Sequence, residues 1–209
     1  MEPIVISKYC IIRDNQLIID GKGILALDKE ISFKEFSKAV YQELKLNYPK
    51  FYKMDNLSKL GLLAAEALNS DFNFEEKYNQ DRIGIVLQNS SSSLDTDNAF
   101  QKTIQDADNF FPSPSVFVYT LPNIVIGEIS IKMKITGESI FFISESFDSE
   151  LMYDYIKQLF ETKSIDCCFA GWIDFLNNDY DCFIMFLERS SDTSQIEFNV
   201  ENMGKLYQS

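Results

Sequence analysis

The sequence predicts an α/β fold in which a mostly parallel sheet is covered by flanking helices. Short apolar runs, typical of strands that are buried on both faces, occur at 82–88, 140–143, 165–170 and 182–187. Segments of ten or more residues with helical spacing alternate with these runs, which favours strand–helix–strand units. The composition, 45% hydrophobic with 8 Gly and 5 Pro, is that of a globular domain.

The N-terminal part predicts strands first and then two helices. Residues 3–27 are expected to form two short strands, with polar turns at 14–15 and 21–23. A helix is expected over 32–46, because its apolar residues recur every three or four positions. A loop with three lysines leads to a second helix over 57–69, which Asp55 or Asn56 can cap.

The middle of the chain continues the alternation. The strand 82–88 is followed by a loop of four serines at 90–93. No glycine-rich turn or Lys-Ser/Thr pair accompanies these serines, so we expect a solvated turn and not a phosphate-binding loop. A helix is expected over 95–107, then a proline-containing breaker at 111–115 and a helix over 124–133.

The last third predicts a strand, a helix and two more strands. The strand 140–143 precedes an amphipathic helix over 148–161, and the strands 165–170 and 182–187 follow. The residues after these strands are polar. We therefore expect one domain over 1–190 and a polar C-terminal tail over 191–209, with no internal repeat.

Charge and hydropathy limit the classes of partner. The chain carries 32 acidic and 19 basic residues, for a net charge of −13. Such a polyanion is expected not to bind nucleic acid or an anionic membrane, because phosphate groups repel it. No apolar run approaches 18 residues and no secretory signal is evident at the N-terminus, so a cytoplasmic location is expected.

Cysteine and histidine usage excludes several kinds of chemistry. The four cysteines, Cys10, Cys167, Cys168 and Cys182, lack the spacing of a disulfide framework or a zinc site. Cys167 and Cys168 should point to opposite faces of their strand, as buried thiols. The 209 residues contain no histidine, which excludes hydrolases that depend on one. We expect neither a metal nor a cofactor.

Five segments, in order, resemble the β-ketoacyl synthase family. Asp55–Leu68 resembles the buried Ala-Ala-x-Ala-Leu helix of the family, and Arg82–Leu87 the strand that follows it. The Pro114–Asn123 segment with Gly127, Ile129 and Gly137 is similar to the run that leads into the nucleophile strand. Asp166–Asp174 resembles the strand ending in Ala-Gly-Gly, and Phe183–Glu188 the strand ending in Leu-Glu.

The resemblance implies one half of a thiolase-like fold. Family chains are about twice this length and consist of two similar α/β halves in a five-layered sandwich. The sequence resembles the first half alone. It departs from the family where the nucleophilic cysteine lies, about nine residues after the counterpart of Gly137: that position is Ser146, and a shift of one residue gives Phe147. The family's two His residues belong to the other half.

The resemblance therefore implies a non-catalytic subunit similar to a chain-length factor, in fatty acid or polyketide biosynthesis. Such subunits pair with an active ketosynthase through the strand ahead of the nucleophile helix, here Ile140, Phe141, Phe142 and Ile143. The side chains expected to line the tunnel for the acyl chain are Phe117, Tyr119, Phe141, Phe142 and Phe147. For Phe141 and Phe142 taken individually, packing in the core or at an interface is favoured over contact with a substrate.

Two other functions remain open. Ser146 could serve an acyl hydrolase or transferase, with Glu145 as its base, although a serine without a base is a weak nucleophile. Alternatively, a homodimer could bind an acyl chain or a carrier protein without chemistry. Lys45, Lys50, Lys53 and Lys59 could form a basic patch for an acidic carrier protein, or a merely solvated surface.

We also expect an obligate dimer, with itself or with a full-length ketosynthase. The helix over 57–68 is apolar around most of its circumference and should not face water without a second half to cover it. The apolar strand 140–143 would invite uncontrolled pairing if its edge were bare.

Overall fold

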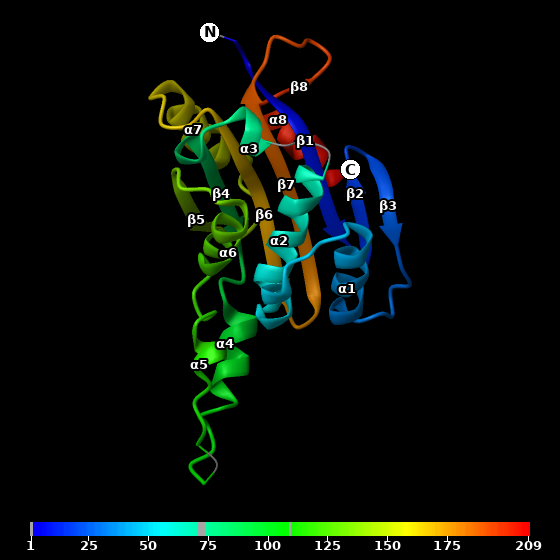
Figure 1. The fold of residues 1–209 in the computed structure, drawn as a ribbon, viewed down its shortest axis with the longest axis vertical. Helices are drawn as coiled ribbons and strands as arrows, with labels where there is room; N and C mark the ends of the chain where they lie inside the picture. The colour runs from blue at the N-terminus through cyan, green and yellow to red at the C-terminus, as the bar shows by residue number, and fades with distance from the viewer. Residues whose placement is uncertain (1, 71–73, 109) are drawn as a thin grey trace.

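A computed structural model describes residues 2–70, 74–108 and 110–209, apart from the Glu75 side chain. The described strands form one eight-stranded sheet in the order β3-β2-β1-β7-β6-β4-β5, with β8 paired to β1 (Figure 1). The strands are β1 Ile4–Arg13, β2 Gln16–Ile19, β3 Lys22–Ala26, β4 Ile83–Asn89, β5 Ser139–Ile143, β6 Cys167–Leu176, β7 Asp179–Arg189 and β8 Ile196–Glu197.

The sheet is mixed, which corrects the expectation of a mostly parallel one. β4 is parallel to β5 and to β6, whereas the described pairs on the other side of β6 are antiparallel. The reason is that β6 and β7 are joined by a tight turn at Asn177 and Asn178, both with positive φ. Asp14 and Asn15 join β1 and β2 in the same way. Two-residue hairpins can connect antiparallel strands only.

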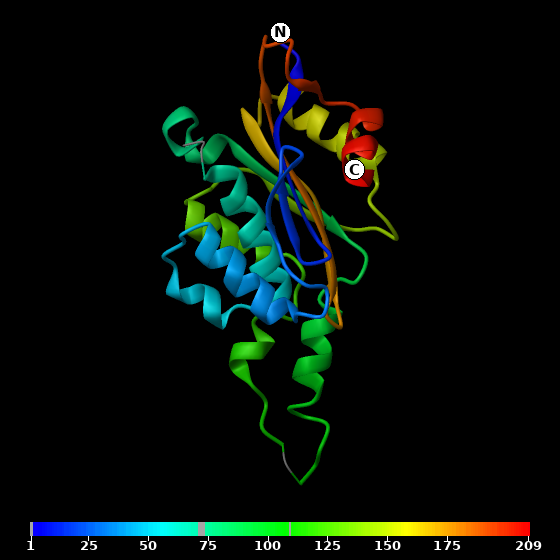
Figure 2. The ribbon, with the colours of Figure 1, turned by 90° about the vertical axis from the view of Figure 1, so that its right-hand side faces the viewer.

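Helices cover both faces of the sheet, which gives three layers (Figure 2). One face is covered by α1 Phe33–Glu43, α2 Asn56–Asn69 and α6 Ile124–Met133, whose apolar side chains share a core with the sheet. α7 Ser149–Glu161 and α8 Val200–Gln208 cover the opposite face. Cys167 belongs to the first core and Cys168 to the second, which confirms that their side chains point in opposite directions.

The cap that the sequence predicts for the second helix is present: Asp55 accepts a hydrogen bond from the Ser58 amide at the start of α2. At the start of α1, Ser32 and Glu35 form a capping box, which was not predicted from the sequence. The shorter helices are η1 Pro49–Lys53, α3 Phe74–Lys77, η2 Gln80–Arg82, α4 Leu94–Gln101 and α5 Pro114–Phe117. No helix in the described part of the chain is long and apolar enough to cross a membrane.

α2 is enclosed by its own chain, contrary to the expectation that another domain or subunit must cover it. All residues from Leu60 to Leu68 are buried. The sheet lies on one side of the helix, and α1 and α6 pack on others. The sequence indicates this apolar circumference, but α6 and β7, which help to cover it, lie far from it in sequence. Its burial therefore gives no reason for a dimer.

The segment over 191–209, expected to be a polar tail, contributes two elements to the fold. β8 pairs with β1, and α8 packs beside α7. The side chains of Phe198 and Met203 are buried. Val200, Met203 and Tyr207 have the three- to four-residue spacing of an amphipathic helix, so the signal was present in a mainly polar segment.

An arm projects from the body below the sheet (Figure 1). It consists of residues 94–108 and 110–121, and it carries α4 and α5. α4 ends at Gln101, well before the expected end at 107, because the polar residues after it have no apolar stripe to pack. Several large apolar side chains of the arm are exposed: Leu94, Phe110, Phe111, Phe117, Val118 and Leu121.

Candidate functional site

The carboxyl ends of the parallel strands β4, β5 and β6 meet at one edge, where open α/β sheets usually bind ligands. The turn over 144–148 links β5 to α7 at this edge. It is held by the Ser144 amide, which donates to the Asn89 carbonyl at 2.9 Å. It is also held by the buried Gln88 side chain, which donates to the Asp148 carbonyl at 3.1 Å and accepts from the Asp148 amide at 3.0 Å. The turn is therefore fixed in position.

The side chains of this turn are not arranged for nucleophilic attack. Ser146 and Glu145 are both exposed to solvent, and the Ser146 hydroxyl makes no hydrogen bond to any described residue. Phe147 points inward, where its ring packs 5.6 Å from that of Phe183 and 4.9 Å from that of Tyr207. The inward position at the start of α7 is thus filled by an aromatic ring.

Tyr207 of α8 connects the turn to the sheet. Its hydroxyl donates to Asp181 Oδ2 at 2.6 Å, and its carbonyl accepts from the Arg13 guanidinium at 2.9 Å. Arg13 also forms an ion pair with Asp181 at 3.0 Å. Burial, and then the hydrogen bond to Asp181, raise the pKa of Tyr207 well above its usual value, so it stays protonated. This network anchors the end of α8 over Phe147.

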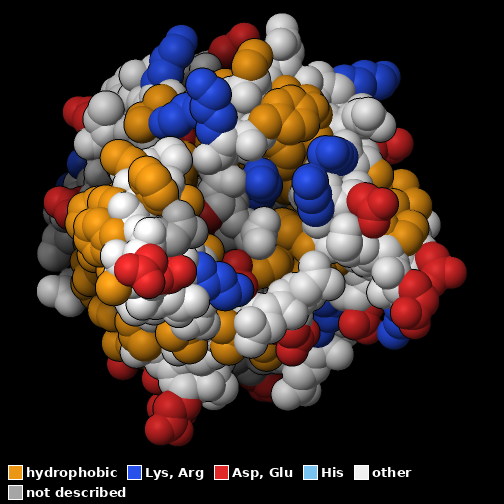
Figure 3. All heavy atoms as spheres, turned by 90° about the horizontal axis from the view of Figure 1, so that it is seen from below, with side chains coloured by type: hydrophobic (Ala, Val, Ile, Leu, Met, Phe, Trp, Pro, Cys, Tyr) orange, Lys and Arg blue, Asp and Glu red, His pale blue; other side chains and the backbone are white. Residues whose placement is uncertain are grey.

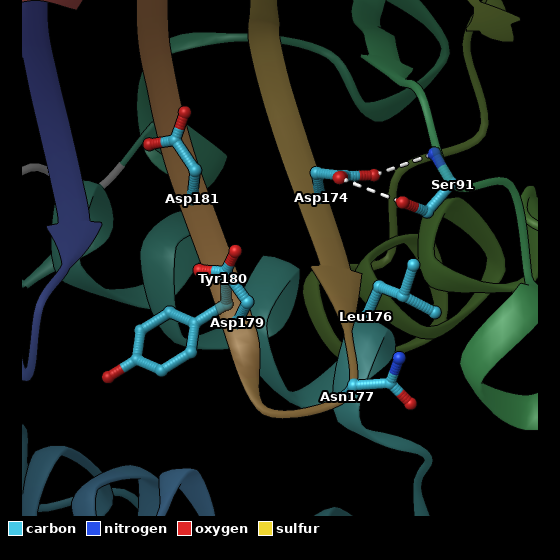
Figure 4. Close-up of a pocket in the computed structure, with 7 residues that line it drawn as sticks. All are labelled: Ser91, Asp174, Leu176, Asn177, Asp179, Tyr180 and Asp181. Carbon is cyan, nitrogen blue, oxygen red and sulfur yellow. Dashed lines mark hydrogen bonds between the residues drawn. The ribbon is translucent and has the colours of Figure 1, made fainter. Parts of the chain in front are cut away.

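A pocket of about 380 Å³ lies at the same end of the sheet (Figure 4). Its lining includes the carboxylates Asp174, Asp179 and Asp181, and no lysine or arginine. Asp174 accepts hydrogen bonds from the amide and the hydroxyl of Ser91 at 2.8 and 2.9 Å, so it holds the loop after β4. The negative charge disfavours an anionic ligand here. No group of His, Cys, Asp and Glu among the described residues could hold a metal ion.

β5 lies at the end of the sheet and pairs with β4 alone among the described strands. Its other edge therefore presents backbone groups without a strand partner. Ile140, Phe141 and Phe142 are partly buried, and Ile143 is 54% exposed. The predicted dimer strand is thus an accessible edge.

Comparisons with known proteins agree with this geometry at the level of fold. No protein-family model matches the chain, and no curated protein matches its sequence significantly. The solved structure of the ishigamide ketosynthase/chain length factor matches with a TM-score of 0.62 and 15% identity, over 92% of this chain and 64% of the other. A complex of a type II PKS acyl-carrier protein with its ketosynthase matches at 0.60 and 14%, over 90% and 63%.

A third match is a complex of the ketosynthase ApeO with its chain length factor ApeC from Xenorhabdus doucetiae. Its TM-score is 0.56 at 11% identity, over 92% of this chain and 81% of the other. The chain has a ketosynthase-type fold. It spans less than two thirds of the matched chain in the first two structures.

The ketosynthase-type fold distributes the five predicted tunnel residues over several places. Phe141 packs against the core shared with α2 and α6, whereas Phe142 and Phe147 lie on the opposite face of the sheet. Phe117 is exposed on the arm, with its ring 5.2 Å from that of Phe100. Tyr119 is buried. Within the described chain these side chains line no common cavity.

Tyr119 belongs to a buried polar cluster at the base of the arm. Its hydroxyl donates to Glu128 at 2.9 Å, and Lys50 pairs with the same carboxylate at 2.7 Å. Burial and the hydrogen bond to Glu128 raise the pKa of Tyr119 well above its usual value. Glu128 is 4% exposed, and Lys50 compensates its charge. Tyr119 helps to satisfy the same buried carboxylate, which is a structural role.

The four predicted docking lysines do not form one group. Lys45 lies beside Lys8 and Lys22 in a groove at the end of α1, and Lys50 is engaged by Glu128. Lys53 lines a different cavity, of about 230 Å³, at the base of the arm. Lys59 interacts electrostatically with Lys34 and Lys38 of α1, two residues that the sequence did not single out.

Proposed function

We propose that this chain is a non-catalytic, ketosynthase-like subunit, similar to a chain-length factor, that partners an active β-ketoacyl synthase. The observation that carries the proposal is the unpaired edge of β5 next to the turn over 144–148. In this turn, where the resemblance places the nucleophile, the inward-pointing side chain is Phe147 and not a reactive group. The pathway is fatty acid or polyketide biosynthesis.

The chemistry of the turn supports a non-catalytic role. Condensation needs a thiolate and residues that stabilise a developing enolate, and the 209 residues contain no histidine and no cysteine near Ser146. The nearby pocket carries Asp174, Asp179 and Asp181, whose charge would oppose the carboxylate of an extender unit.

The exposed apolar surface supports a partner. Ile143 at the end of β5 and Ile131 of α6 are 54% and 63% exposed, and the arm adds Phe111 at 75% and Phe117 at 59%. β5, α6 and the arm lie on the same side of the molecule in Figure 1, and exposed apolar side chains concentrated on one side mark an interface. A partner strand against β5 would make the two sheets continuous, and the arm would then reach the partner's surface, where Phe117 could contact an acyl chain.

The solved structures favour the same kind of partner. Two of the matched structures are described as a ketosynthase with its chain length factor, and one includes an acyl-carrier protein. The share of the matched chain covered in the ApeO–ApeC complex, 81%, shows that a chain closer to this length occurs in such a complex.

Co-purification tests the pairing. A full-length ketosynthase from the same gene neighbourhood should co-purify with the wild-type chain after co-expression. Ile143→Lys should reduce the recovered complex about tenfold or more, because a charge within an apolar contact must be desolvated. Ile24→Lys is the matched control: it introduces the same charge on β3, the strand at the other end of the sheet, where Ile24 is 41% exposed.

The outcomes separate the hypotheses. Loss of the complex with Ile143→Lys alone supports pairing through β5. A wild-type chain that forms a homodimer sensitive to Ile143→Lys, and does not bind the ketosynthase, favours the homodimeric binding module. A folded monomer that co-purifies with no ketosynthase contradicts the proposed function.

The alternative of an acyl hydrolase or transferase has its own test. We expect no turnover of acyl or malonyl thioesters by the purified chain, because Ser146 has no base within hydrogen-bonding distance among the described residues. Turnover that disappears in Ser146→Ala but persists in Ser144→Ala would establish the enzyme instead.

A further inference from the structure

Another pocket lies at the end of the sheet opposite to the turn over 144–148. It has a volume of about 340 Å³ and is lined by Tyr78, Phe160, Lys163, Ile165, Asp166 and Arg189. These include the residues that precede β6 and the last residue of β7, and in Figure 1 these ends of the two strands lie at the top, near α3. Figure 3 shows the lower end, where hydrophobic, Lys and Arg side chains surround a hollow, so the two regions are separate.

The apolar wall of this pocket is fixed by the core. Phe160 and Ile165 are each 2% exposed and pack in the core between α7 and the sheet. The Tyr78 hydroxyl donates to the buried carboxylate of Glu188, which also pairs with Lys77 at 2.5 Å. Burial, and then the hydrogen bond to Glu188, raise the pKa of Tyr78 well above its usual value, so the phenol stays protonated. The wall therefore exists before any ligand binds.

Arg189 is held in one orientation and still has donors to offer a ligand. Its Nη1 group donates to the Glu2 carbonyl at 2.6 Å, and its guanidinium lies 5.5 Å from the centre of the Phe160 ring. A guanidinium has five N–H donors, and the other side-chain donors of Arg189 make no hydrogen bond to a described residue. The contacts with Glu2 and Phe160 thus orient the guanidinium without using up its donors.

The pocket carries positive charge that the described residues do not neutralise. Asp166 accepts from Arg82 through both carboxylate oxygens, at 2.9 and 3.2 Å, so the charges of this pair cancel. Neither Lys163 nor Arg189 forms an ion pair with a described residue. In a chain with a net charge of −13, two cations that line one pocket and lack an acidic partner indicate a site for an anion.

The surroundings favour a single negative charge joined to an apolar group. Phosphate sites are typically built from helix N-termini and glycine-rich turns. This pocket instead lies at the C-terminal end of α7, where the helix dipole is negative, and its described lining contains no glycine. Asp166 and Glu188 would add to the repulsion of a doubly charged ligand. A carboxylate needs less compensation, and an apolar group attached to it would contact Phe160 and Ile165.

We propose that this pocket binds a small organic carboxylate, at a site separate from the pairing through β5. The carboxylate accepts from Arg189, whose fork of N–H donors matches two oxygens. Lys163 adds a second positive charge from the turn after α7. The aliphatic or aromatic group of the ligand packs on Phe160 and Ile165, and removing that surface from water adds to the affinity. The volume suits a short acid, since small-molecule sites have roughly 300–1,000 Å³.

Proton–nitrogen correlation NMR of the full chain tests the proposal with phenylacetate as the probe. Phenylacetamide is the neutral control of nearly the same shape, and acetate carries the charge without the ring. We expect phenylacetate to shift the amide resonances of residues 160–166 and 189 in a saturable way. Its affinity should exceed that of either control by about tenfold or more, because charge-assisted hydrogen bonds and apolar contact both contribute.

Variants of Arg189 test the assigned contact. Arg189→Gln removes one positive charge from the pocket and should lower the affinity for phenylacetate about tenfold or more. Arg189→Lys keeps the charge without the fork of donors, so its loss should be smaller. Lys157→Gln is the matched control: it also changes the net charge by −1, from −13 to −14, and Lys157 lies on α7 outside the pocket lining. It should change the affinity about twofold or less, because solvent and salt screen a charge at that distance.

Lys163→Gln is a second test, because Arg189→Gln also loses the hydrogen bond to the Glu2 carbonyl and could disturb the fold. It should weaken the binding of phenylacetate about threefold, with the far-ultraviolet circular dichroism unchanged. Absence of saturable binding, equal affinity for phenylacetate and phenylacetamide, or equal losses in Arg189→Gln and Lys157→Gln would overturn the proposal. A peptide ending in Phe that binds about tenfold more tightly than phenylacetate would overturn it in favour of the C-terminus of a partner protein.

Discussion

Asp55 shows how one residue combines two opposing contributions to stability. Its carboxylate accepts hydrogen bonds from the Ser58 amide and the Thr96 hydroxyl, both at 3.0 Å, and so caps α2 and ties it to α4. Burial nevertheless raises the pKa of Asp55, and this effect exceeds the lowering by its hydrogen bonds and by Lys59. The cap is therefore favourable, while the charge on it is costly.

Replacing Asp55 separates the cap from the charge. Asp55→Asn keeps a capping oxygen without the charge, so we expect equal or greater stability at pH 7. Asp55→Ala removes the cap and should lower the free energy of unfolding by about 1–2 kcal/mol. Urea denaturation followed by circular dichroism measures both changes.

The pH dependence has a defined sign. A carboxyl group whose pKa is raised by folding destabilises the folded state when it is ionised, so its cost is present above the folded pKa and disappears as the pH falls through it. Any advantage of Asp55→Asn over the wild type should therefore be largest near pH 7 and shrink in acid. An advantage that grows in acid would contradict the assigned cause.

The contact between α2 and α6 depends on a glycine within a helix. A Cβ added to Gly61 would clash with Val125 Cγ2 and lie 3.2 Å from Ile173 Cδ1. Gly61 thus allows α6 and the sheet to approach α2 closely. The sequence placed Gly61 inside the helix correctly, but its packing role depends on residues more than sixty positions away.

Gly61→Ala should therefore destabilise the protein, although alanine is the better helix former by about 1 kcal/mol. We expect a net loss of about 1–3 kcal/mol from overpacking, and partial recovery in Gly61→Ala/Val125→Ala. Gly204 of α8 is the matched control, because a Cβ there would meet no atom within 4 Å. Gly204→Ala should stabilise the protein by up to about 1 kcal/mol, measured by thermal unfolding.

The control also tests the C-terminal segment. A loosely held tail would gain nothing from Gly204→Ala, since helix propensity affects stability only where a helix forms. Stabilisation would be independent support for α8. If Gly61→Ala stabilised the protein as well, the close packing of α2 and α6 would be wrong.

The sheet has a parallel part and an antiparallel part, and the two arise from different kinds of connection between strands. The parallel part, with β4, β5 and β6, arises because helix-containing segments connect its strands. The antiparallel part arises from the hairpins that join β1 to β2 and β6 to β7. β5, whose outer edge has no strand partner among the described strands, belongs to the parallel part. The proposed partner would therefore bind next to the turn over 144–148, which follows β5.

The enclosure of α2 changes the expected role of a partner. Since its own chain covers α2, a second subunit is not required to shield this helix. The apolar surface left for a partner is the edge of β5, the exposed Ile131 and the arm. The reason to propose a partner is therefore the apolar surface at the edge of the sheet and on the arm, and not the burial of α2.

Most of the secondary structure can be predicted from the sequence alone. Helical and strand periodicities are local, which is why α1, α2, α6, α7 and the strands β1, β2, β4, β5 and β7 lie where the patterns predict. β3 and β8 are not predicted, and β6 extends well past the expected end at 170. The absence of histidine, and of cysteine near Ser146, is a property of composition and spacing.

Which side chains meet depends on the packing of the folded chain. Phe147 packs against Phe183 and Tyr207, and Lys59 lies near Lys34 and Lys38, in each case across long stretches of sequence. The direction in which the strands pair and the burial of α2 also depend on contacts between elements that are separated in sequence. Such contacts depend on how elements pack in three dimensions, and the spacing of residues within one element carries no record of them.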